Sequence, residues 1–253
     1  MSVKDLFDLT GKVALVTGGS RGIGREIALC LGRGRCSVAI AFRTNKIEAQ
    51  RVTAALQTLG VNAMAVQTDV TEPGRVQALV QEVVGRMGRL DILVNNVGDF
   101  HWKAVADSSL DEWHAIVASN FFSVFYASKY ALPAMRAARW GRIINLGAVG
   151  AERAFGQARI SAYAAAKSAM VAFTRSLALE EARNGITVNV VNPPIMSEAS
   201  LSVEEAARIR DARFPAGRPP STEDIASAVK FFASEEASFI TGQVLNVAGG
   251  WML

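Results

Sequence analysis

Short apolar runs alternate with amphipathic segments along most of this chain. From Val76 to Met87, apolar residues recur three and four positions apart, which is helical spacing. Seven other runs are short and apolar, as expected of buried parallel strands. They span residues 12–17, 38–42, 63–68, 92–95, 142–146, 187–191 and 244–247. Alternating strands and helices predict an α/β fold with a Rossmann-type, doubly wound parallel sheet of about seven strands.

Local patterns predict further helices. Ser109 and Glu112 have the spacing of a capping box, which would open a long helix that reaches about Ala138. An alanine-rich stretch predicts another helix from Ser161, and residues 204–208 predict a short one. Because the chain has no linker, internal repeat or low-complexity tract, we expect a single domain over residues 1–253.

A glycine-rich turn follows the first predicted strand. It has the spacing G-x-x-x-G-x-G, unlike the more familiar G-x-G-x-x-G, and it leads into a helical pattern that contains Ile27. Glycine allows close backbone approach, and a helix start offers free N–H groups to a pyrophosphate. Strand, glycine turn and helix together predict a dinucleotide site. Its candidate residues are Gly18, Ser20, Arg21, Gly22, Ile23 and Gly24.

The second predicted strand ends without the acidic residue that would bind the ribose hydroxyls of NAD. The chain instead has Arg43 there, with Lys46 close behind and Arg21 inside the glycine turn. A guanidinium suits the 2′-phosphate of NADP. The alternative is that Arg43 and Lys46 only solvate a loop. We expect NADP(H) in preference to NAD(H).

The composition of the chain argues against a membrane protein and against a secreted, disulfide-rich protein. The 253 residues are 50% hydrophobic, enough for a full core. No run approaches the roughly 18 consecutive apolar residues of a membrane helix, and the first residues lack the apolar core of a secretory leader. Cys30 and Cys36 follow no metal spacing and make a poor disulfide framework. We therefore expect a cytoplasmic protein that is not attached to a membrane.

The charge pattern does not favour nucleic acid as a partner. The net charge of +4 is spread thinly, with no arginine-rich run, and suits anionic small molecules better. The two histidines, His101 and His114, form no cluster, so we expect no metal site.

Tyr163 and Lys167 lie four residues apart in the predicted helix, on one face. The Lys167 ammonium, with a nicotinamide cation after hydride loss, favours phenolate and is expected to lower the pKa of Tyr163. Tyr163 is then a candidate general acid for a carbonyl oxygen. Taken alone, this pair also fits an ordinary surface tyrosine and lysine.

Together with the glycine turn, these motifs identify a family resemblance. The chain resembles the short-chain dehydrogenase/reductase family along nearly its full length, and within it the bacterial 3-oxoacyl-[acyl-carrier-protein] reductases. The motifs that carry the resemblance are residues 17–24, Asn95-Asn-Val-Gly98, Asn120, Tyr163-x-x-x-Lys167, Asn192-Pro-Pro194, residues 215–218 and residues 240–250.

The resemblance implies an NADPH-dependent oxidoreductase that reduces a 3-oxoacyl thioester or similar ketone, with Tyr163 as the proton donor. Lys167 would also hold the ribose hydroxyls, and Asn120 would anchor a water that passes protons to Lys167. The remaining implied nucleotide contacts are Asp69, Val70, Asn95, Gly98, Pro193 and Met196. Phe100 and Trp102 would lie near the substrate mouth.

The resemblance also suggests a homotetramer built through the long helices and the C-terminal region. The apolar ending, residues 249–253, fits burial at such a subunit contact.

Four positions depart from the family pattern. Ala148 stands where the family has a serine that donates to the substrate oxygen, a loss worth about 2.7–4 kcal/mol. The other three are Val97 for alanine, Pro194 for glycine, and Ser197-Glu198 where a threonine is usual. Ser161 or a bound water is a candidate replacement for the missing donor.

Ala148 keeps two alternatives open. The first is a reductase of pterins or other heterocycles, whose planar ring would stack on Phe100 or Trp102. The second is a catalytically weak subunit that binds nucleotide within a hetero-oligomer.

Overall fold

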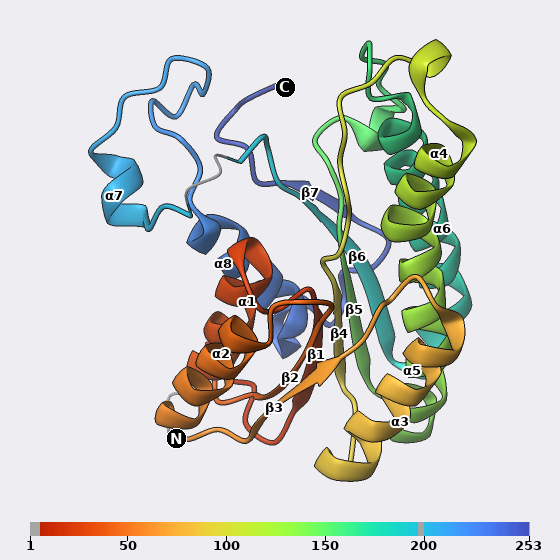
Figure 1. Cartoon of the computed structure of the whole chain (residues 1–253). Helices are drawn as coiled ribbons and strands as arrows, with labels where there is room; N and C mark the ends of the chain where they lie inside the picture. The colour runs from red at the N-terminus through yellow and green to blue at the C-terminus, as the bar shows by residue number, and fades with distance from the viewer. Residues whose placement is uncertain (1–5, 197–199, 253) are drawn as a thin grey trace.

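A computed structural model describes residues 6–196 and 200–252 (Figure 1). Seven parallel strands form one sheet in the order β3-β2-β1-β4-β5-β6-β7. The strands are β1 (Val13–Thr17), β2 (Ser37–Phe42), β3 (Ala63–Gln67), β4 (Ile92–Asn95), β5 (Gly141–Leu146), β6 (Ile186–Asn192) and β7 (Val244–Asn246). The predicted doubly wound parallel sheet is therefore confirmed.

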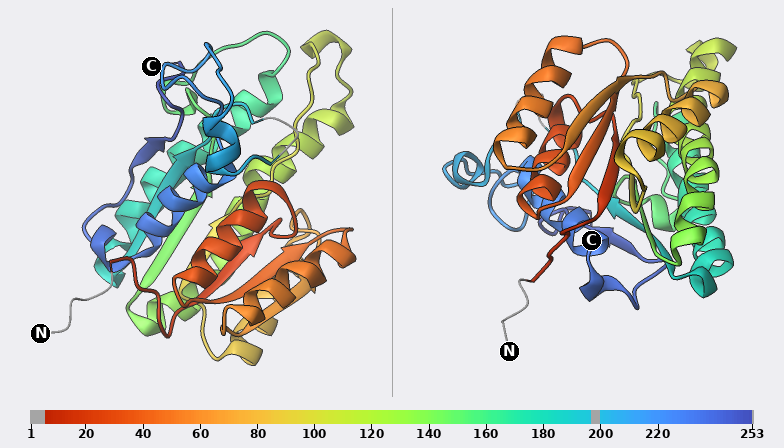
Figure 2. Two further views of the ribbon diagram at one scale, coloured as in Figure 1. Left: turned by 90° about the vertical axis from the view of Figure 1, so that its left-hand side faces the viewer. Right: turned by 90° about the horizontal axis from the view of Figure 1, so that it is seen from below.

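Helices cover both faces of the sheet, as Figure 2 shows in two further views. They are α1 (Gly22–Arg33), α2 (Lys46–Thr58), α3 (Pro73–Met87), α4 (Leu110–Val117), α5 (Ser123–Ala138), α6 (Ser161–Glu181), α7 (Val203–Ala207) and α8 (Thr222–Ala233). Alternate residues of each strand point to opposite faces. Accordingly, Val16 and Ile40 belong to the core under α1, α2 and α8, whereas Leu15 and Ala39 belong to the core under α3, α5 and α6.

The long helix predicted from Ser109 to Ala138 is interrupted. Its capping box is present, because the Ser109 hydroxyl accepts from the Glu112 N–H and the Glu112 carboxylate accepts from the Ser109 N–H. The helix then loosens into a π turn, Ala118–Phe122, before it resumes as α5. Such π turns often mark functional positions, and this one contains Asn120.

The sheet order places the functional segments at one edge. Since all strands are parallel, their carboxyl ends lie at the same edge, and the order reverses between β1 and β4, where open α/β sheets bind ligands. The glycine turn follows β1, Arg43 follows β2 and Gly98 follows β4. Within the described residues, no helix has the length and apolar character needed to cross a bilayer.

Candidate active site

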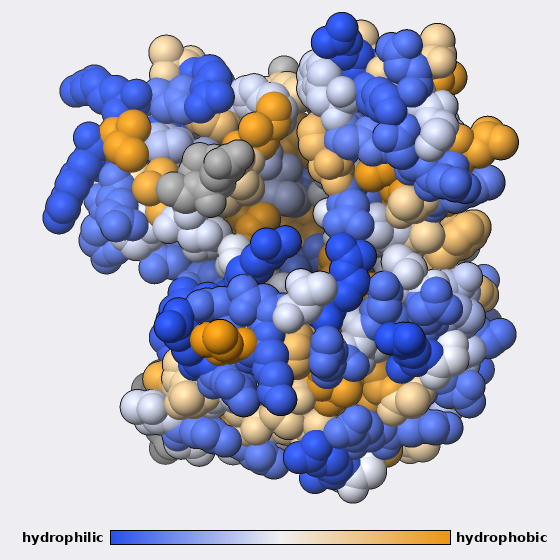
Figure 3. Space-filling model, viewed as in Figure 1, coloured by the Kyte–Doolittle hydropathy of each residue, from blue (hydrophilic) through white to orange (hydrophobic). Residues whose placement is uncertain are grey.

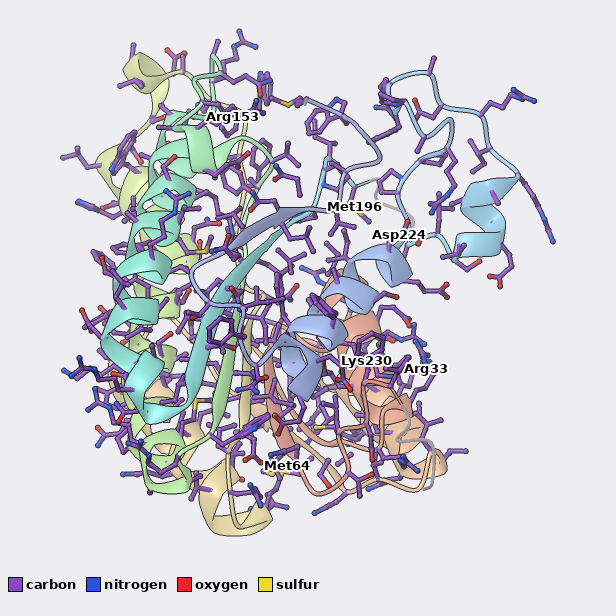
Figure 4. The ribbon with its side chains drawn as sticks, turned by 180° about the vertical axis from the view of Figure 1, so that it is seen from behind. Arg33, Met64, Arg153, Met196, Asp224 and Lys230 are labelled. Carbon is purple, nitrogen blue, oxygen red and sulfur yellow. The ribbon has the colours of Figure 1, made fainter. Side chains whose placement is uncertain are left out.

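A cleft of about 320 Å³ opens at this edge. Viewed as in Figure 1, the surface is hollowed between the lobe that carries α7 and the upper ends of α4 and α6 (Figure 3). The lining of the 320 Å³ cleft includes ten of the predicted nucleotide contacts. They are Gly18, Ser20, Arg21, Gly22, Ile23, Gly24, Arg43, Asp69, Val70 and Gly98. Pro193 and Met196 do not line it and lie beyond the end of β6, where Figure 4 labels Met196.

Asn96 holds the glycine turn in place. Its side-chain amide donates to the carbonyls of Thr17 (3.0 Å) and Gly18 (3.3 Å). A Cβ on Gly24 would stand less than 3.0 Å from the Gly18 carbonyl oxygen and from the Asn96 amide. Only glycine therefore fits at this position, which is the close backbone approach that a dinucleotide cradle needs.

We expect Gly24→Ala to lower the affinity for a nicotinamide dinucleotide by about five- to 150-fold. The added methyl group displaces the turn or Asn96, and overpacking of this kind costs about 1–3 kcal/mol. The matched control is Gly85→Ala in α3, where a Cβ meets nothing within 4 Å. Titration of both variants with the dinucleotide checks the prediction, and equal affinities would contradict it.

The Asn95 side chain forms a hydrogen bond between two strands of the sheet and does not line the cleft. It is buried, and its amide donates to the Asn145 side-chain oxygen at 2.8 Å. Asn145 in turn donates to the Thr174 hydroxyl at 2.8 Å. Its neighbour Asn96 lines the cleft instead. The structure therefore places Asn96 of this motif, and not Asn95, at the cleft, and a nucleotide contact by either residue stays a prediction.

Asp69, one of the two acidic residues that line the cleft, is held ionised. Burial acts to raise the pKa of its carboxyl, but hydrogen bonds from the Thr71 hydroxyl and N–H, with the charges of Arg43 and Arg75, bring that pKa below its usual value. The Thr71 hydroxyl and N–H lie 2.7 and 3.0 Å from the carboxylate. Asp69 is thus a fixed hydrogen-bond acceptor at the cleft wall.

Tyr163 and Lys167 share one face of α6, as predicted. The Lys167 ammonium donates to the Leu146 carbonyl at 2.6 Å and lies 5.6 Å from the centre of the Tyr163 ring. Burial lowers the pKa of Lys167 to about 8. Burial also raises the pKa of Tyr163 to about 12.

The expected lowering of the Tyr163 pKa is therefore wrong for the chain without ligand. The Lys167 ammonium is turned toward the Leu146 carbonyl and does not offset the loss of solvent around the phenol. With a pKa raised to about 12 by burial, Tyr163 is protonated across the physiological pH range.

The lowered pKa of Lys167 makes stability pH-dependent. In the unfolded chain Lys167 stays protonated up to a pKa near 10.5, whereas in the folded chain it loses its proton above a pKa of about 8. The unfolded state binds more protons in between, so stability rises with pH there. We expect the free energy of unfolding of the wild type to rise by up to about 3 kcal/mol relative to Lys167→Met from pH 8 to above pH 10.

Denaturant titration of both proteins without cofactor, at several pH values from below 8 up to about 10, measures this difference. The raised pKa of Tyr163 keeps it neutral over this window. Parallel stability curves for the two proteins would contradict the prediction.

Asn120 lies in the π turn and faces the same space as Lys167. Its amide donates to the carbonyls of Asp99 (2.8 Å) and Ile116 (2.9 Å). Its oxygen is buried and has no hydrogen-bond partner among the described residues. A Cβ on Gly98 would lie less than 3.0 Å from that oxygen and 3.3 Å from the Lys167 nitrogen. An orphaned acceptor beside an ammonium fits the water position that the resemblance implies.

Sequence comparison identifies the family. A family model described as enoyl-(acyl carrier protein) reductase matches residues 18–252. The 3-oxoacyl-[acyl-carrier-protein] reductase FabG of Salmonella typhimurium is 42% identical over 243 residues, covering 95% of this chain and 97% of that protein. The chain belongs to the short-chain dehydrogenase/reductase family.

Other members of the short-chain dehydrogenase/reductase family agree with this assignment. The FabG of Escherichia coli K12 is 41% identical over 244 residues, with 95% of this chain and 97% of that protein covered. The crystal structure of acetoin dehydrogenase YohF from Salmonella typhimurium matches with a TM-score of 0.87 and 33% identity, covering 95% of this chain and 96% of that chain. A putative 3-oxoacyl-reductase from Bacillus thuringiensis matches with a TM-score of 0.88 and 31% identity, covering 96% and 98%. These proteins differ in substrate, so the shared result is an oxidoreductase family.

In this short-chain dehydrogenase/reductase, Ala148 follows β5 and is half-buried. Its carbonyl accepts from the Ala151 N–H at 3.0 Å, which starts a tight turn. The methyl side chain offers no hydrogen-bond donor. Ser161, the suggested substitute, opens α6 and lines a shallow crevice together with Tyr163.

Phe100 and Trp102, the residues predicted to lie near a substrate mouth, form an exposed aromatic cluster with Tyr163. The rings of Phe100 and Tyr163 meet edge to face at 5.1 Å, and Phe100 lies 6.3 Å from Trp102. Phe100 and Trp102 are 53% and 50% exposed. The contact between Phe100 and Tyr163 is compatible with the predicted substrate mouth, which stays a prediction.

The sequence did not predict a polar network that joins the turn after β5 to the ends of β6 and β7. The Glu152 carboxylate accepts from the amides of Asn192 (3.1 Å) and Asn246 (3.0 Å), and Asn192 also donates to the Asn246 oxygen at 2.8 Å. The neighbouring Arg153 donates to the Met252 carbonyl; Figure 4 labels Arg153 at this end of the molecule. The network ties the carboxyl ends of β6 and β7 to the turn after β5.

The other departures from the family pattern have different settings. Val97 is half-buried and lines the cleft, and Pro194 is buried just after β6. Ser197 and Glu198 lie outside the described residues. Among the described residues, no three His, Cys, Asp or Glu side chains are placed to hold a metal ion.

Proposed function

We propose that this protein reduces the carbonyl group of a 3-oxoacyl thioester or similar ketone, with NADPH as the reductant. The observation that best supports this proposal is the placement of Tyr163, Lys167 and the unpaired oxygen of Asn120 close together, next to the cleft that contains the glycine turn. The 42% identity to a 3-oxoacyl-[acyl-carrier-protein] reductase supports the substrate class.

The residues of the cleft fit a nicotinamide dinucleotide. Gly24 leaves room that a Cβ would fill, and the α1 start has no acidic residue in its first turn to repel a pyrophosphate. Arg43 and Arg21 line the cleft and favour a 2′-phosphate. When bound, NADPH supplies the hydride that the carbonyl carbon receives.

Three side chains supply and replace the proton that the carbonyl oxygen receives. The Tyr163 hydroxyl, protonated at physiological pH, donates its proton to the carbonyl oxygen as that oxygen gains charge. The Lys167 ammonium stabilises the resulting phenolate and returns a proton to it. Asn120 holds the water that reprotonates Lys167 from solvent.

A second candidate substrate is a pterin or other planar heterocycle. It is favoured by the exposed rings of Phe100 and Trp102 beside Tyr163 and by the absence of a donor at Ala148. A reducible ring that stacks on these side chains depends less on that donor than a small ketone does.

Steady-state kinetics with NADPH and an acetoacetyl thioester test the proposal. Consumption of NADPH that requires the thioester supports the ketone reductase. Turnover of a dihydropterin but not of the thioester would move the assignment to the second candidate. Tight NADPH binding with turnover of neither would indicate a catalytically weak subunit.

We also propose a homotetramer. Phe122 and Phe125 are 43% and 38% exposed and form one aromatic cluster with Tyr126 and Phe173 from α5 and α6. Burying this surface against another copy removes apolar area from water. Light scattering at micromolar concentration checks the mass, and a monomer would contradict the proposal.

A further inference from the structure

An ion pair spans the opening of the cofactor cleft. Arg43 follows β2 and Asp99 follows the turn after β4, and both line the same cleft. One guanidinium nitrogen of Arg43 lies 3.9 Å from a carboxylate oxygen of Asp99. The guanidinium that would take a 2′-phosphate therefore already faces a carboxylate inside the cleft.

The backbone of Asp99 is anchored at both ends. Its N–H donates to the Ser119 hydroxyl at 3.2 Å, and its carbonyl accepts from the Asn120 amide at 2.8 Å. Both partners belong to the π turn, Ala118–Phe122. The backbone of Asp99 is consequently fixed at the cleft, and its exposed carboxylate starts from this fixed position.

The side chain of Asp99 has only this electrostatic partner in the described part of the chain. The other acid of the cleft, Asp69, is satisfied by the hydroxyl and N–H of Thr71. No described residue donates a hydrogen bond to the Asp99 carboxylate, and Arg43 is the cation that it faces at 3.9 Å. Asp99 is thus available to compete for Arg43.

We propose that Asp99 is a specificity-determining residue that competes with the 2′-phosphate of the cofactor for Arg43. The inference rests on the proposed use of NADPH. A phosphate monoester carries nearly two negative charges and bonds a guanidinium more strongly than a carboxylate does. The guanidinium nitrogen that faces Asp99 must leave that carboxylate to bond the phosphate, so the ion pair weakens phosphate binding only through Arg43. The preference for a 2′-phosphate is set by this competition as well as by Arg43.

Two adenine nucleotides isolate the 2′-phosphate without any turnover. Calorimetric titration with 2′,5′-ADP and with 5′-AMP gives the ratio of their affinities, which differ only through the 2′-phosphate. In Asp99→Asn we expect this ratio to rise about two- to fivefold, the size expected for an exposed ion pair. The control Asp107→Asn makes the same charge change at an exposed residue outside the cleft lining, and its ratio stays at the wild-type value.

The same substitution in an Arg43→Ala background completes the test. If Asp99 acts by competing for Arg43, then Asp99→Asn no longer changes the ratio of the 2′,5′-ADP and 5′-AMP affinities when Arg43 is already alanine. An unchanged or lower ratio in the single variant, or a rise that persists without Arg43, overturns the inference while leaving the proposed function intact. Equal binding of both nucleotides by the wild type overturns the inference together with the proposed NADPH preference.

Discussion

Tyr163→Phe is expected to lower kcat for ketone reduction by about 10²–10⁴, the usual contribution of a positioned general acid. The substitution removes only the hydroxyl. The edge-to-face packing on Phe100, with ring centres 5.1 Å apart, remains available to phenylalanine. Since burial keeps the pKa of Tyr163 near 12, the wild-type residue starts in the protonated form that reduction requires. The NADPH-dependent rate with an acetoacetyl thioester measures the loss.

Tyr130→Phe is the matched control for this experiment. Tyr130 lies on α5, packed against the core under α3, α5 and α6 and away from the cleft lining. It is expected to leave kcat unchanged. Both variants should bind NADPH like the wild type, because neither hydroxyl lies in the glycine cradle. Retention of wild-type kcat by Tyr163→Phe would remove Tyr163 from the chemistry and would favour a different proton donor.

The centre of the sheet was predictable because its strands are buried on both faces, unlike the edge strands β3 and β7. Every residue of β1, from Val13 to Thr17, is buried, and so is every residue of β6. Such strands appear in the sequence as unbroken apolar runs, which need no alternation to be recognised. The predicted bounds of the seven strands differ from those observed by at most one residue at either end.

Two helices were not predicted from the sequence. They are α2, whose apolar face is weak, and α8, which buries Ile225, Val229 and Phe232, although each carries a start signal. The Asn45 side chain accepts from the Glu48 N–H, and Ser221 forms a capping box with Asp224. The π turn around Asn120 was also missed, because its apolar spacing continues that of the flanking helices.

Site residues were predictable where the chemistry is local in sequence. The glycine turn, Arg43 and the pair Tyr163 and Lys167 depend on neighbours within a few residues. Three features join segments 40 or more residues apart. They are the link between Asn95 and Asn145, the Glu152 network, and the ion pair between Arg43 and Asp99. Only the folded arrangement brings such partners together. The same holds for the raised pKa of Tyr163, which comes from burial by the whole site.

Ala148→Ser is expected to raise kcat for ketone reduction by about 10²–10³. The gain equals the cost of removing one hydrogen-bond donor from the developing oxyanion, about 2.7–4 kcal/mol. Ala148 is half-buried at the carboxyl end of β5, so a hydroxyl adds one atom there without filling the core. Kinetics with NADPH and an acetoacetyl thioester measure the change. Ala158→Ser, an exposed position in the same loop, is the control and is expected to change nothing.

A double variant decides whether the gain belongs to the proposed chemistry. If the new hydroxyl assists proton donation by Tyr163, then Ala148→Ser combined with Tyr163→Phe recovers little of the lost rate, because residues that act as a unit are not additive. An Ala148→Ser enzyme no faster than the wild type would mean that the site already has a donor. In that case we expect Ser161, at the start of α6 beside Tyr163, to be that donor. Ser161→Ala should then lower kcat by the factor that was expected as the gain from Ala148→Ser. A site in which neither substitution changes ketone reduction does not use an oxyanion donor, and this result would favour the planar heterocycle as substrate.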